Sequence, residues 1–154
     1  MNRFCFCLLV LSLAACSSEQ QERQAAPAPA QEAPTLQRTT APTDARVFFI
    51  TPADGTTVSS PVSVEFGMEG MAVVPAGDTT PVSGHHHILI DADLPDLNLP
   101  IPKDERHVHF GDGSSATELT LAPGEHTLQL LFADHLHIPH EPPVYSERIT
   151  ITVK

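Results

Sequence analysis

Short segments that alternate apolar and polar residues, separated by turn sequences, constrain the fold of this chain more than any other feature. Residues 62–66 read VSVEF and residues 116–122 read ATELTLA, so every second side chain is apolar in both. A period of two places these apolar side chains on one face of an extended strand. Turn-forming pairs such as Pro123-Gly124 separate the segments. The pattern predicts β-strands that cover a common core.

Seven segments have this strand character, and none of the chain resembles a capped helix of useful length. The 15 prolines also disfavour helix in the connections. Seven short strands with turns between them predict an all-β fold, an immunoglobulin-like β-sandwich of about seven strands. Two long connections, 67–83 and 92–105, either carry function or decorate one end of the sandwich. The predicted strands are 46–52, 62–66, 86–91, 106–110, 116–122, 125–134 and 144–154.

The N-terminus has the pattern of an export signal. Arg3 precedes an apolar run that is too short to span a bilayer as a stable anchor. Residues 13–16 read LAAC and resemble the bacterial lipobox, which is cut before a cysteine that then carries lipid; an ordinary cleavage site with a chance cysteine is the alternative. The resemblance implies a signal peptide at 1–15 and lipidation at Cys16. Because Ser17 rather than Asp follows, it also implies an outer-membrane lipoprotein whose domain lies in the periplasm or at the cell surface.

Residues 16–44 have the composition of a tether. They are rich in Ala, Pro, Gln and Thr, and such a segment buries too little apolar surface to offset the entropy of ordering. The folded domain is therefore predicted at 45–154. Cys5 and Cys7 leave with the signal peptide, so the domain contains no thiol. Thiolate metal sites and cysteine nucleophiles are excluded from it.

Charge and motifs narrow the function. A formal net charge of −11 argues against nucleic acid and against electrostatic binding to anionic lipid, and it suits cations, so membrane contact is expected only through lipid on Cys16. The chain has no Gly-x-Ser-x-Gly elbow, no His-Glu-x-x-His motif, and no phosphate or dinucleotide loop. We therefore expect no organic cofactor and no enzyme. A metal-dependent hydrolase, with Asp134 or Glu141 as the general base, is the third alternative.

Six of the nine histidines occur in three pairs with one residue between the partners of each pair, and His140 lies close to the third pair. In an extended chain, both side chains of such a pair point to the same side, with Cβ atoms roughly 6–7 Å apart. Imidazoles without thiolate suit zinc or copper, and also nickel. Thioethers of Met68 and Met71 would favour Cu⁺ if their loop folded over the site. The predicted metal ligands are His85, His87, His107, His109, His135, His137 and His140.

The two remaining histidines fall on apolar faces. His86 alternates in phase with Ile88, and His126 with Leu128, so both are predicted to be structural, with ring nitrogens bonded to backbone carbonyls. The pairs then predict a domain that binds copper or zinc in the periplasm. The alternatives are a structural network of histidines and a non-metal binding module that recognises an envelope protein or glycan through His-lined loops; no particular protein partner is indicated.

The His-bearing segments also carry a family resemblance. The run ITPADGTTVSSPVSVEFGMEGM, followed by GHHHILID, HVHFGDGSS and DHLHIPHEPPVYSERITITV, resembles a bacterial family called domain of unknown function 4399. The resemblance covers nearly all of the predicted domain. It implies a small secreted or periplasmic β domain and no particular activity.

Overall fold

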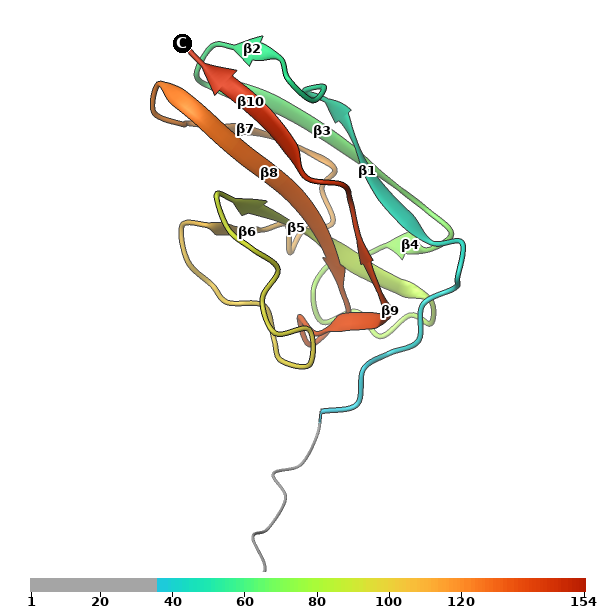
Figure 1. Cartoon of the computed structure of the whole chain (residues 1–154). Coiled ribbons are helices and arrows are strands. Elements are labelled where there is room, and N and C mark those ends of the chain that lie inside the picture. The colour runs from blue at the N-terminus through green and yellow to red at the C-terminus, as the bar shows by residue number, and fades with distance from the viewer. Residues whose placement is uncertain (1–35) are drawn as a thin grey trace, which may run out of the picture. The chain divides into compact units, whose positions relative to one another are not determined.

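The computed structural model describes residues 36–154 of the chain (Figure 1). The predicted signal peptide, the lipidation at Cys16 and most of the predicted tether lie outside the described residues. Within 36–154 the chain forms strands and their connections, and no helix there is long and apolar enough to cross a membrane.

Two sheets form the domain, and the prediction of an all-β sandwich is confirmed (Figure 1). The smaller sheet has the order β1-β3-β7, and the larger has the order β2-β10-β8-β5-β4, with β6 also paired to β5 and β9 to β8. The strands are β1 (Arg46–Thr51), β2 (Thr57–Val58), β3 (Val62–Glu69), β4 (Ala72–Val73), β5 (Ser83–Ile90), β6 (His107–His109), β7 (Ala116–Leu119), β8 (Gly124–Ala133), β9 (Pro139–Tyr145) and β10 (Ile149–Val153).

The hydrophobic core between the two sheets follows from the alternation. Val64 and Phe66 of β3 face Ile88 of β5 and Leu130 of β8, and all four side chains are fully buried. Burial of one such side chain stabilises the fold by roughly 1.5–3 kcal/mol, so this face dominates the stability of the sandwich. The period-two pattern therefore identified the inner faces of both sheets correctly.

All seven predicted segments contain a strand, and three further strands were not predicted. β2 and β4 are only two residues long, which is too short to show a period. β9 contains Pro139, Pro142 and Pro143, which argue against a strand in sequence. Within the larger sheet it pairs with the end of β8, at Leu131–Ala133, where the missing N–H groups of the prolines are tolerated at the sheet edge.

Residues 36–44, called here the N-terminal arm, lie against the sandwich. Ala41 is buried, its N–H donates to the carbonyl of Glu141 (3.0 Å), and the N–H of Glu141 donates to the carbonyl of Thr39 (2.8 Å). The arm was included in the predicted tether, whereas it contacts β9. The folded unit therefore begins before Ala45, because partners far away in sequence satisfy the backbone groups of the arm.

Strand β5 is buried on both of its faces over its whole length. His86 and Ile88 face the core between the sheets. On the other side, Leu89 packs with Leu131 and Ala133 of β8 and with Ile101 from the loop 92–105. The larger sheet therefore has a covered outer face, which also carries His85 and His87.

Candidate metal centre

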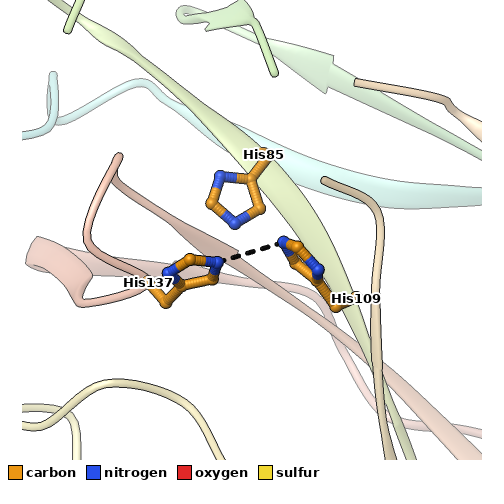
Figure 2. A group of neighbouring side chains, drawn as sticks. All are labelled: His85, His109 and His137. Atoms are coloured by element: carbon orange, nitrogen blue, oxygen red, sulfur yellow. Dashed lines mark hydrogen bonds between the residues drawn. The ribbon is translucent and has the colours of Figure 1, made fainter. Parts of the chain in front are cut away.

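Four histidine rings converge on the outer face of the larger sheet. His85 and His87 come from β5, His109 from β6, and His137 from the loop between β8 and β9. All pairs among the four rings have centroids 4.8–5.9 Å apart. Figure 2 shows three of these rings directed toward a common centre. We call His85, His87, His109 and His137 the histidine group.

The register of β5 with β6 selects which histidines can meet. In this antiparallel pair His87 lies opposite His109, and Leu89 lies opposite His107. His85 is therefore diagonal to His109, with a centroid separation of 4.9 Å, whereas His107 is displaced toward the far end of β5. A cross-strand pair brings side chains into contact, and its diagonal neighbours remain within reach of long side chains.

Ring nitrogens of His85, His109 and His137 lie close enough together to bind one small ion, and His87 adjoins His85. Nε2 of His85 lies 3.1 Å from Nε2 of His87, and Nε2 of His109 lies 3.2 Å from Nε2 of His137. One ligand atom from each of His85, His109 and His137 lies within 4.8 Å of the others. Metal–nitrogen bonds of about 2.0–2.1 Å in a tetrahedral site place neighbouring nitrogens about 3.3–3.4 Å apart. The two measured separations are close to that value.

The turn that carries His137 is held by the carboxylate of Asp134. Its Oδ1 accepts the N–H groups of Leu136 (2.9 Å) and Ile138 (3.1 Å), and the carbonyl of Asp134 accepts the N–H of His137 (2.9 Å). His137 has a φ of 65°, in the left-handed region that few side chains adopt. The N–H of Ile101 donates to the carbonyl of His137 (2.9 Å), so the loop 92–105 secures the same residue.

Burial keeps the inner histidines of the group neutral. Desolvation, together with a smaller effect of the neighbouring histidines, lowers the pKa of His85 to about 4 and that of His87 to about 2. Desolvation, with a contribution from His137, also lowers the pKa of His109. The Nδ1 atoms of His85 and His87 are buried without a hydrogen-bond partner among the described residues. At neutral pH these rings are uncharged and carry lone pairs, as metal ligands must.

Three of the seven predicted ligands lie outside the histidine group. His107 pairs with the carboxylate of Asp104, 2.8 Å from its Nδ1, because of the strand register. His135 is on the same loop as His137 but is not brought to the group. His140 stacks on Phe132, a residue of the core between the sheets, because β9 turns its ring to the inner side.

The two histidines predicted to be structural differ from each other. His126 Nε2 lies 2.9 Å from the carbonyl of Ala122, as predicted, and its Nδ1 lies 2.7 Å from the carboxylate of Asp91. His86 is buried as predicted, but neither of its nitrogens has a partner among the described residues, so the expected carbonyl contact is wrong. Its ring packs edge-on against Phe66 and Phe132, which supply no acceptor.

The methionines considered as soft ligands and the acidic residues considered as a general base make other contacts. Met68 and Met71 pack against the core between the sheets. Both oxygens of Asp134 accept hydrogen bonds, and Glu141 forms an ion pair with Arg38. The hollow lined by Val47–Phe49, Pro52–Asp54, Ser146, Glu147 and Ile149 contains none of the histidines.

Fold and site together define a class: small β-sandwich domains with a group of histidines on the outer face of one sheet. The sequence model of a family described as "Domain of unknown function (DUF4399)" matches residues 64–154, and the chain belongs to this family. The matched region contains all four residues of the histidine group, and the resemblance noted from sequence is confirmed. None of the curated proteins matches the chain.

Proposed function

We propose that the domain binds one transition-metal ion, copper or zinc, through His85, His87, His109 and His137. The observation that carries the proposal is the convergence of four imidazoles from three separate segments of the chain. Two of these segments are neighbouring strands, and the third is a loop whose backbone is held in a left-handed conformation.

The energetics of the group support an ion at its centre. The closest contacts in the group join pairs of Nε2 atoms, His85 with His87 and His109 with His137. An ion bound between the Nε2 atoms would use both lone pairs of a pair at once, whereas a hydrogen bond needs a proton on one of the two atoms. Without an ion, each neutral imidazole has one N–H and one lone pair. Every contact between two ring nitrogens then depends on the single proton of one of them.

The donor set indicates the kind of site. Four imidazole ligands fill a tetrahedral coordination shell, whereas hydrolytic zinc sites keep one position for water. The candidate group contains no carboxylate among the described residues, which leaves no obvious general base. Nitrogen donors of this type suit copper and zinc rather than calcium or magnesium. These features favour a carrier or buffer over a hydrolase.

Exposure within the group increases from the sheet outward. His85 and His87 are buried, His137 is half-buried, and His109 is exposed. An ion would therefore arrive at His109 and His137 and then reach the two ligands of β5. A site with one open side suits reversible loading, as a buffer or carrier requires.

Titration of the metal-free mature protein, without a His tag, tests the proposal. Wild type should bind one equivalent of Zn²⁺ or copper, with a dissociation constant well below millimolar. His109→Ala and His137→Ala should each weaken binding by more than about tenfold, because losing one ligand breaks the coordination shell. His135→Ala is the matched control on the same loop and should leave affinity unchanged. Wild-type binding no tighter than millimolar, or equal losses in all three variants, contradicts the proposal.

The location proposed for this activity is the outer membrane, through lipid on Cys16. It rests on the LAAC sequence at 13–16 and on the proline-rich residues that follow. Cys16→Ser should release the domain as a soluble species or leave an uncut precursor. Membrane fractionation identical to that of wild type would show that Cys16 is not the anchor.

A further inference from the structure

The N-terminal arm reaches the turn that carries His137. Its backbone pairs with β9 through Thr39, Ala41 and Glu141, and Figure 1 shows it passing β9 at one end of the larger sheet. The guanidinium of Arg38 donates to the carbonyls of Pro139 (2.9 Å) and His140, and it pairs with the carboxylate of Glu141. The arm is thus attached over several residues, not at a single point.

Thr39 links the arm to Asp134 directly. Its hydroxyl lies 3.2 Å from Oδ2 of Asp134 and 2.7 Å from Nδ1 of His140. A carboxylate can only accept hydrogen bonds, and one hydroxyl carries one proton. Both contacts are satisfied when Thr39 donates to Asp134 and accepts the Nδ1–H of His140. Burial lowers the pKa of His140, which is consistent with a neutral ring in this arrangement.

The two oxygens of Asp134 therefore accept hydrogen bonds from different segments of the chain. Oδ1 holds the N–H groups of Leu136 and Ile138 on either side of His137, and Oδ2 is held by Thr39. Asp134 is itself buried, so an oxygen without a donor would cost free energy and would favour another orientation of the carboxylate. Rotation of the carboxylate would release the two N–H groups that give His137 its left-handed backbone.

We propose that Thr39 is a positioning residue for the metal site, and that docking of the N-terminal arm sets the affinity of the site through Asp134 and His137. This inference rests on the proposed function, since it concerns the same four ligands. It makes the arm a regulator of metal binding: a chain whose arm is displaced from β9 would hold its ion with three well-placed ligands and one mobile ligand.

Three substitutions in the arm test the inference in the full mature chain. Thr39→Val removes the hydroxyl and keeps the shape, Thr39→Ser restores the hydroxyl, and Thr40→Val makes the same change at the exposed neighbouring position. Loss of an outer partner of a ligand typically weakens metal binding by 10–100-fold, so we expect about tenfold weaker Zn²⁺ binding in Thr39→Val. Thr39→Ser and Thr40→Val should bind like wild type. The visible spectrum of the Co²⁺ form should change only in Thr39→Val, because His137 loses its fixed geometry.

Hydrogen exchange of the metal-free protein separates failure of this inference from failure of the proposed function. The amides of Leu136 and Ile138 should exchange faster in Thr39→Val than in Thr40→Val, whether or not any metal binds. Equal protection in the two variants, or wild-type Zn²⁺ affinity and Co²⁺ spectrum in Thr39→Val, overturns the inference. Faster exchange in a protein whose wild type binds no metal would refute the proposed function, and with it the regulatory role of the arm.

Discussion

His126 and His87 lie on neighbouring strands of the same sheet and have opposite surroundings. His126, near the start of β8, has both ring nitrogens next to oxygens, of Asp91 and of Ala122. The contact with Asp91 is the main cause that raises the pKa of His126. His87, in the middle of β5, is buried among other imidazoles, and desolvation lowers its pKa to about 2.

The difference shows how a histidine that stabilises a fold can be told from one that is available to a ligand. An imidazole between two acceptors is stabilised in its cationic form, and once protonated it has no free lone pair. An imidazole buried away from carboxylates is neutral, and its lone pair remains available. The predictions below test this contrast between His126 and the histidine group.

The largest expected effect is acid destabilisation of the metal-free domain. The pKa of buried His86 falls from 6.5 to about 4, so below pH 6.5 the unfolded chain binds a proton that the folded chain does not. By pH 4 this difference alone costs roughly 3 kcal/mol, and His85 and His87 act in the same direction. Urea unfolding at pH 7 and pH 4 measures it. Equal free energies of unfolding at the two pH values would mean that these rings are not buried.

Substitution of His87 should separate metal affinity from stability. His87→Leu removes one ligand and should weaken Zn²⁺ binding by more than about tenfold, or about 1.4 kcal/mol. The metal-free domain should be as stable as wild type or more so, because an apolar side chain replaces a buried ring with an unsatisfied nitrogen. Calorimetric titration and urea unfolding measure the two quantities. Loss of stability together with retained affinity would reverse the assignment.

Substitution of His126 should have the opposite pattern. His126→Ala should lower the free energy of unfolding by about 1 kcal/mol, a value reduced for the partial solvent exposure of the pair, and leave Zn²⁺ affinity unchanged. Because the folded pKa of His126 is raised, its contribution is complete below pH 6.5 and is lost as the pH rises through the folded pKa. The difference from wild type should thus be larger at pH 5.5 than at pH 9. A constant difference would exclude the charged contact with Asp91.

The smallest effect is expected at the pair formed by His107 and Asp104. The carboxylate of Asp104 is exposed, and solvent screening weakens pairs of this kind. His107→Ala should leave the urea midpoint of unfolding and the metal affinity close to those of wild type. A loss of affinity here comparable to that of His109→Ala would place His107 back among the ligands and change the register inferred for the site.

The sequence alone determined the fold class and the faces of the strands. A period of two needs no partner strand to be recognised, because successive side chains of any extended chain point to opposite sides. It placed His86 with Ile88 on the inner face of β5, and His85 with His87 on the outer face. Both placements are confirmed.

Only the tertiary structure decided which histidines meet. The pairs at 107–109 and 135–137 look equivalent in sequence, but each contributes one residue to the group. For the first pair the reason is register, which depends on the alignment of two strands and is invisible in either strand alone. For the second pair it is the turn held by Asp134, whose carboxylate is held in turn by Thr39, 95 positions away in sequence. Contacts across such distances arise only when the chain folds, because local patterns do not encode them.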